Sequence, residues 1–574
     1  MCTLGDYILM KAVEEKRSPP AVTNDSNNSG AMESKPVPNT KQSSRYLMTR
    51  KGYLHPMKTY IWITLLTTGI MSALWFVLGT GPDPQGTIPP GFAFGWSDLY
   101  FHSIAIGIAS LAAYFVIISF ELDKYEPNID FPMAYRATLA TLIGAAGAFF
   151  YLRPVFHQYL APIPLALILI GLILLGDVGG ALIIELYLLP GKLSDRYDSS
   201  KNVLGMIPRW SCLPNWSDFR KMDATYWLTF VTVISTFIAG MIGFVVFWLN
   251  YLVLDLGISP AIFTDYVGWI GGGSAMLGYT MGAHSHVIGM TIILGVVAVA
   301  AKRLGVLNLT GTKRTVAKFG MWVSGVGIVI MVGVFLLEGF STVWPSATPP
   351  LLFASYPGSV QLWSSTAKNG MAGDDSTMFL ASAGAMIMLV PLLFTSVRGK
   401  PAWRDPLRLS ILATWILAYI ATPIEGFFIE FNEATMSGGP TDIVFGNLQY
   451  FALFGITMVT IAFLAVDFFQ DKKGTRSTVA TLGMLVTTFT VIVGYIYAFL
   501  DPGALNPDGT LSGITTWGLV YAGGLLLVSA VLIAATVAVY KGAQTPLSIP
   551  VTGDQGAVNP KLKTMPKKKF FQPT

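Results

Sequence analysis

Long apolar runs constrain the fold of this chain more than any other feature of its sequence. Each run has about 20 residues, the length at which a helix crosses the hydrocarbon core of a bilayer. Because lipid offers the backbone no hydrogen-bond partner, each run must close its own hydrogen bonds as a helix. The sequence therefore predicts an all-α, polytopic integral membrane protein. About twelve transmembrane helices are expected, at 59–79, 99–120, 134–153, 163–190, 225–254, 275–301, 315–340, 376–397, 408–430, 445–467, 478–500 and 515–540.

Composition excludes a soluble protein of this length. Hydrophobic residues make up 53% of the chain and charged residues only 12%, too few to cover a water-exposed surface. The formal net charge of +5 does not indicate a nucleic-acid partner, because the basic residues cluster beside the apolar runs. Cys2 and Cys212 both fall in segments predicted to be cytoplasmic, so neither a disulfide nor a cysteine metal site is expected.

The two ends of the chain differ from the part between them. Residues 1–56 mix Ser, Asn, Pro and Lys without a long apolar run, which predicts a disordered cytoplasmic tail and no cleavable signal sequence. Residues 541–574 are similar and basic, ending near "KKKFF". The expected organisation is therefore a membrane domain over 57–540 between two cytoplasmic tails.

The basic residues set the predicted orientation. Segments that follow the odd-numbered runs are almost free of Lys and Arg, with Lys368 the clear exception and Arg153 at a run edge. By the positive-inside rule, both termini are cytoplasmic, and a plasma-membrane location is expected. The basic residues that follow the even-numbered runs are Lys124, Lys192, Arg196, Arg209, Arg220, Lys221, Lys302, Arg303, Lys313, Arg314, Arg398, Lys400, Arg404, Lys472, Lys473 and Arg476.

A short internal repeat links the second run to the sixth. "YFHSIAIGI" at 100–108 and "GAHSHVIGM" at 282–290 share His-Ser-x-x-Ile-Gly when His102 is aligned with His284. The tenth run has a fainter echo, "YFALFGI" at 450–456. The spacing of four runs predicts three four-helix repeats, one way in which a large bundle surrounds internal sites.

Four of the five histidines fall in the predicted outer leaflet. His102, His157, His284 and His286 lie there, and His55 is expected to be cytoplasmic. Ionisable residues within a membrane are functional candidates, because their burial without a partner is costly. His284 and His286 are two residues apart, which is about 200° of rotation on a helix. They therefore face opposite sides and serve two sites rather than one chelate.

Histidines in this pattern suit a metal cofactor. Neutral imidazole is an axial ligand of haem iron and also a ligand of copper, which fits less well here. Asp98 lies one turn before His102 and is placed to orient its ring. Two alternatives stay open: hydrogen bonds between helices, to which an interfacial His157 is particularly suited, and a proton or ion path.

Carboxylates also fall within or at the ends of the predicted runs. Such residues suit a proton relay or a cation site, but some of them could instead pair with Arg136, Arg153 or the backbone. They are Asp177, Glu185, Glu338, Glu425 and Glu430.

The His-x-His pair on an inward-running helix resembles the catalytic subunits of haem–copper oxidases and nitric oxide reductases. The resemblance rests on His284 and His286, on His102 near the outer end of the second run, and on twelve runs with functional helices spaced by four. It implies that His102 pairs with His284 or His286 around one haem b, while the other histidine faces a second site. The family's copper-ligand motifs have no counterpart, so a complete oxygen-reducing centre is not expected.

These observations favour a b-type cytochrome-like membrane subunit. It would transfer electrons in a respiratory-type chain, linked to quinol or to an outer-face partner, as an oxidoreductase subunit with haem held by His102, His284 and His286. A secondary transporter or ion channel that uses the intramembrane carboxylates is the alternative. A third reading is a structural subunit of a larger membrane complex.

Overall fold

The structure, a computed structural model, describes part of the chain, and all the described residues belong to one of its two structural units, residues 48–574. The predicted tails at 1–56 and 541–574 lie outside the described residues, except for the end of the last helix and the residue after it. The described residues are 62–67, 69–70, 107–122, 130–151, 162–194, 213–250, 274–343, 373–394, 396–397, 400–417, 441, 444, 448, 451, 455–504 and 515–542.

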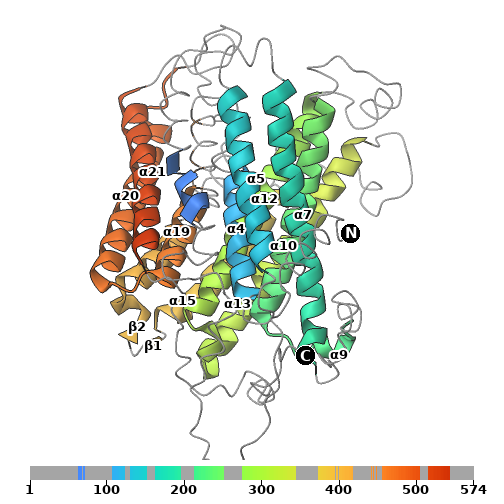
Figure 1. Cartoon of the computed structure of the whole chain (residues 1–574), viewed down its shortest axis with the longest axis vertical. Helices are drawn as coiled ribbons and strands as arrows, with labels where there is room; N and C mark the ends of the chain where they lie inside the picture. The colour runs from blue at the N-terminus through green and yellow to red at the C-terminus, as the bar shows by residue number, and fades with distance from the viewer. Residues whose placement is uncertain are drawn as a thin grey trace, which may run out of the picture. The chain divides into compact units, whose positions relative to one another are not determined.

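The described part of the chain is almost entirely helical (Figure 1). One two-residue hairpin, β1 (Ser396–Val397) with β2 (Lys400–Pro401), is its sheet. The helices are α4 (Gly107–Leu122), α5 (Asp130–Tyr151), α7 (Pro162–Lys192), α9 (Trp216–Phe219), α10 (Ala224–Asn250), α12 (Ser274–Arg303), η5 (Val306–Asn308), α13 (Gly311–Val343), α15 (Gly373–Leu393), η6 (Ala402–Arg404), α19 (Ile456–Phe469), α20 (Lys473–Leu500) and α21 (Thr516–Lys541).

The helices fall where the apolar runs predicted them. Each of the twelve predicted ranges contains described helical residues, including 62–67 in the first and the apolar helix Pro406–Leu417 in the ninth. Within the described residues, five helices are long and apolar enough to cross a membrane: Ala166–Lys192, Ala224–Met241, Gly311–Gly333, Lys473–Leu500 and Thr516–Lys541. The all-α membrane class is confirmed, and the number twelve stays a prediction.

Local signals explain where several helices begin and end. Before α10, the Asp223 carboxylate accepts a hydrogen bond from the backbone N–H of Tyr226 at 2.9 Å, which satisfies one of the free donors of the first turn. Thr515 does the same for Gly518 before α21, at 3.2 Å. After α12, Gly305 takes a left-handed conformation with φ of 89°, which glycine adopts without a steric penalty. Polar caps and glycine therefore mark the ends of the apolar segments.

Neighbouring helices along the chain pack in pairs. α5 packs against α7, α10 against α12, α13 against α15, and α20 against α21; the last pair is drawn in orange and red in Figure 1. The outward faces of these helices carry large apolar side chains that are about half exposed, such as Trp322 and Val329 on α13. Soluble proteins rarely expose many large apolar side chains together, and these faces suit contact with lipid.

Three helices form the interior of the described bundle: α4, α12 and α19 contact one another pairwise. Every residue of α19 is buried, as is every residue of α12 over 287–301 and of α4 over 110–119. A helix that is apolar all round is expected to be enclosed in this way. These helices lie in the second, sixth and tenth predicted runs, so the runs that share the repeat also share the centre of the bundle.

Candidate functional site

The structure places the paired histidines on the central helix. His284 and His286 belong to the backbone of α12, directly before the enclosed segment 287–301; their side chains lie outside the described residues. Glu338 belongs to α13, likewise without a described side chain. The remaining predicted site residues that lie outside the described part of the chain are His102, His157, Asp98, Glu425 and Glu430.

The enclosed segment of α12 packs directly against α4 at Gly295. A Cβ atom added at Gly295 would lie 2.3 Å from the ring of Tyr114, so glycine is what lets that ring reach the helix. Tyr114 is fully buried. A macrocycle therefore has no room beside α12 at Gly295.

A cluster of hydroxyl groups lies in the same interior. The Tyr114 hydroxyl of α4 donates to Thr232 Oγ1 of α10 at 3.1 Å. A separate hydrogen bond joins α10 to α12: Thr236 Oγ1 donates to Thr291 Oγ1 at 2.7 Å. Thr232, Thr236 and Thr291 are at most 1% exposed. The sequence did not lead us to predict this cluster. Thr232 and Thr236 are four residues apart on α10, a spacing that places both on one face of the helix.

Two of the predicted carboxylates are engaged in ion pairs. Asp177 on α7 pairs with Arg136 on α5, and Glu185 pairs with Lys192 at 2.6 Å. Pairing with Arg136 was the alternative to a proton relay or cation site that the sequence left open for these carboxylates. Both carboxylates are thus compensated, and Asp177 ties α5 to α7.

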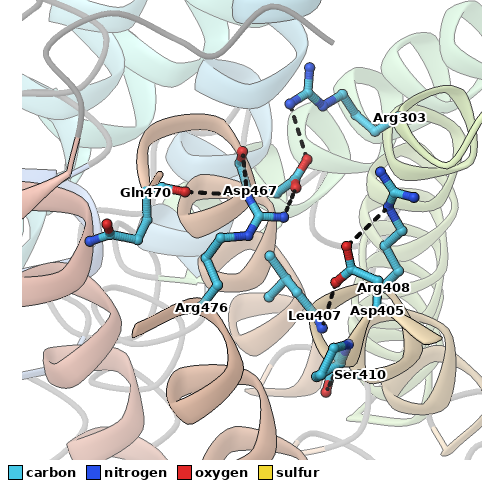
Figure 2. A network of polar contacts seen from close by, with 9 residues as sticks. Arg303, Asp405, Leu407, Arg408, Ser410, Asp467, Gln470 and Arg476 are labelled. Atoms are coloured by element: carbon cyan, nitrogen blue, oxygen red, sulfur yellow. Dashed lines mark hydrogen bonds and ion pairs between the residues drawn. The ribbon is translucent and has the colours of Figure 1, made fainter. Parts of the chain in front are cut away.

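A second cluster of charges joins the ends of three helices (Figure 2). Asp467 of α19 lies between Arg303 of α12, at 3.0 Å, and Arg476 of α20, at 2.6 Å. The three side chains are each less than a tenth exposed. Arg303 also stacks on the Phe468 ring, 4.1 Å from its centre. We call Arg303, Asp467 and Arg476 the charged triad.

Neighbouring polar groups extend the charged triad. Arg476 Nη1 donates to the carbonyl of Gln470 at 3.2 Å, and the Gln470 amide donates to the carbonyl of Ala538 on α21 at 2.7 Å. The ends of α12, α19 and α21 and the start of α20 therefore lie on one side of the bundle, as a chain that alternates across a membrane requires. Which side faces the cytoplasm stays a prediction.

An apolar cavity of about 270 Å³ lies between α4, α7 and α10. Its walls include Leu111 and Phe115 of α4, Gly176 of α7, and Phe237 of α10, and Thr236 is its polar contribution. The cavity therefore adjoins the hydroxyl cluster. Its lining suits an apolar chain rather than a polar ligand.

Together these features define an α-helical integral membrane protein whose central helix carries two histidines above a buried hydroxyl cluster. No family model matches the chain, and comparison with curated proteins finds no match. Within the described residues, no three His, Cys, Asp or Glu side chains gather as ligands of a metal ion; the predicted histidine donors are not among those side chains.

Proposed function

We propose that the protein is a b-type cytochrome-like membrane subunit that transfers electrons. The supporting observation is the position of the histidine pair: His284 and His286 lie on α12, one of three enclosed helices that contact one another. Those helices come from the predicted runs that share the sequence repeat. Functional helices spaced by four are also part of the resemblance to haem–copper oxidase catalytic subunits. The enclosed segment 287–301, which directly follows the histidine pair, excludes water from that part of the bundle, as the surroundings of a redox cofactor require.

The donor positions suit a haem. Helix geometry places residues 284 and 286 on opposite sides of α12, and both precede the segment where the Tyr114 ring closes the space beside Gly295. In the proposal His102 and one histidine of the pair hold the haem iron, and the other faces a second site. A bound haem supplies one-electron oxidation and reduction. The chain's residues hold it, orient it and exclude water.

The electron donor in this proposal is a quinol. The cavity between α4, α7 and α10 is apolar and adjoins the interior of the bundle, which are the properties that an isoprenoid tail requires. A respiratory-type partner on the outer face would accept the electrons. Replacing Gly176, whose added Cβ would meet nothing within 4 Å, by leucine is expected to weaken quinol-dependent reduction without removing haem.

An absorbance spectrum tests the proposal directly. Protein purified from haem-sufficient cells is expected to show a Soret band, and His102→Ala, His284→Ala or His286→Ala is expected to abolish or shift it, because an axial ligand is lost. His55→Ala, a histidine outside the predicted membrane domain, is the matched control and should leave the band unchanged. A colourless wild-type protein, or a band that survives all three substitutions unaltered, contradicts the proposal.

A secondary transporter is the alternative, favoured by the Asp177–Arg136 ion pair between α5 and α7. Charges within spans commonly mark substrate or ion paths. For this function, vesicles should show substrate uptake that Asp177→Asn abolishes, in a protein without a Soret band. If Asp177→Asn only lowers the thermal stability, the ion pair serves packing and the transporter reading is wrong.

A further inference from the structure

Three exposed aromatic rings each lie beside a basic side chain. Trp216 is 64% exposed, Phe394 61% and Trp403 48%. A cation over the face of an aromatic ring is attracted by the electrons of the ring. The pairs, with the distance from the charged group to the ring centre, are Arg220 over Trp216 at 5.5 Å, Lys313 over Phe394 at 5.7 Å and Arg404 over Trp403 at 4.6 Å. We call these residues the aromatic–basic rim.

The three pairs of the aromatic–basic rim lie at one end of the bundle. Asp223, which directly precedes α10, lines a small cavity together with Leu189 near the end of α7 and Lys302 near the end of α12. α9 lies beside them, because it contacts α7 and ends just before Asp223. Residues 304–310 alone separate the end of α12 from the start of α13, which the ring of Phe394 meets, and η6 contacts α15. This is the end that the sequence predicts to face the cytoplasm.

The exposed charge at this end is almost entirely positive. Within the described part of the chain, every exposed lysine and arginine side chain lies here, and Asp471 is the exposed carboxylate. Asp218 and Asp467 belong to the same end but are buried; Asp218 caps α9. The exposed basic residues are Arg220, Lys221, Lys313, Arg314, Lys318, Arg404, Lys472, Lys473 and Lys541.

The aromatic–basic rim lies where the outward faces of the helices change from charged to apolar. On α13, the exposed Lys313 and Arg314 are followed by Phe319 and Trp322, which are both more than half exposed. On α15, an apolar outward face ends at Phe394. Aromatic rings and basic side chains gather in this way at the headgroup level of a bilayer, where an apolar body and a polar end are both accommodated.

Neither helix stability nor membrane topology accounts for the whole arrangement. α13 has Lys313 and Arg314 in its first turn, and α20 begins at Lys473, with no acidic residue in the first turn of either helix. Positive charge at the start of a helix opposes its dipole. The positive-inside rule explains basic residues on this side, but it requires no aromatic ring beside them. A negatively charged ligand with an apolar body would satisfy both the charges and the rings.

We propose that the aromatic–basic rim binds the headgroups of anionic phospholipids in the surrounding leaflet. The arginine and lysine side chains donate hydrogen bonds to phosphate oxygens, and the rings lie where the headgroup joins the acyl chains. An acidic protein would match the charges but not the exposed apolar faces that adjoin the rim. This binding goes beyond electron transfer and does not depend on a bound haem.

Lipid titration of the purified full-length protein tests the proposal. Native mass spectrometry in a neutral detergent measures the dissociation constants of phosphatidylglycerol and of phosphatidylcholine with the same acyl chains. The wild type is expected to bind phosphatidylglycerol about tenfold or more tightly, since each basic residue near an anionic headgroup contributes about fivefold. The triple variant Arg220→Gln with Lys313→Gln and Arg404→Gln is expected to lose most of this preference.

The matched control removes as many exposed charges from the same end but outside the rim, by Lys472→Gln with Lys473→Gln and Lys541→Gln. It should keep most of the preference, and the thermal stability of both triple variants should equal that of the wild type. A wild type that binds the two lipids equally overturns the proposal and leaves an acidic protein as the partner of this surface. Equal losses in the two triple variants also overturn it, because net charge alone would then select the lipid. Displacement of phosphatidylglycerol by an equal concentration of glycerol 3-phosphate would indicate a site for free phosphate instead.

Discussion

Replacing Asp467 by alanine is expected to lower the free energy of unfolding by about 3–5 kcal/mol, because it leaves two buried arginines without a compensating charge. Asp467 is 4% exposed and bonds to Arg303 and Arg476 at 3.0 and 2.6 Å (Figure 2). Its loss also separates α12, α19 and α20 at the end where they meet. Denaturation of the purified protein in mixed micelles measures the effect.

The control for this prediction lies four residues away. Asp471 is an aspartate in the same connection but is exposed, so Asp471→Ala should change the stability by no more than about 0.5 kcal/mol. A triple variant, Arg303→Met with Asp467→Leu and Arg476→Met, should recover most of the loss, since apolar groups can replace a buried ion pair at little cost. Equal stabilities of Asp467→Ala and Asp471→Ala would show that the charged triad is not a structural tie.

The helices were the predictable part of this fold. The run predicted at 163–190 forms the helix Pro162–Lys192, and the run predicted at 515–540 forms the helix Thr516–Lys541. The agreement is close because a backbone in lipid has few other ways to satisfy its hydrogen bonds. Where a helix is longer than the predicted run, polar contacts stabilise the additional turn. α20 begins at Lys473 rather than 478, in the turn that places Arg476 against Asp467.

The contacts between distant segments were not predictable in the same way. Arg303 and Arg476 were read as charges that mark the cytoplasmic side, and nothing in the local sequence shows that both bind Asp467. Arg303 and Asp467 are 164 residues apart, and Tyr114 and Thr232 are 118 apart. A hydropathy profile shows that a charged or polar residue stands within an apolar run or at its end. Only the packing of the helices decides whether such a residue finds a partner.

Gly320→Ala and Gly384→Ala are each expected to destabilise the protein by about 3 kcal/mol, the upper range for overpacking a close contact. α13 and α15 touch through their backbones at these glycines. A Cβ atom at Gly384 would lie 2.3 Å from the backbone nitrogen of Ser324, and one at Gly320 would lie 2.5 Å from the Gly384 carbonyl. Small residues allow such close approach between membrane helices, and the Ser324 hydroxyl uses it to donate to the Ala381 carbonyl at 2.8 Å.

Gly325, on the same helix, should respond in the opposite direction. A Cβ atom there would meet nothing within 4 Å, so Gly325→Ala is expected to stabilise the protein by about 0.5–1 kcal/mol through helix propensity alone. The same denaturation measurement applied to all three alanine variants separates packing from propensity, because the chemical change is identical. If Gly320→Ala and Gly384→Ala are as stable as Gly325→Ala, the close backbone contact between α13 and α15 does not exist in the protein. If only the first two are destabilised, the close approach of these helices holds the two runs together.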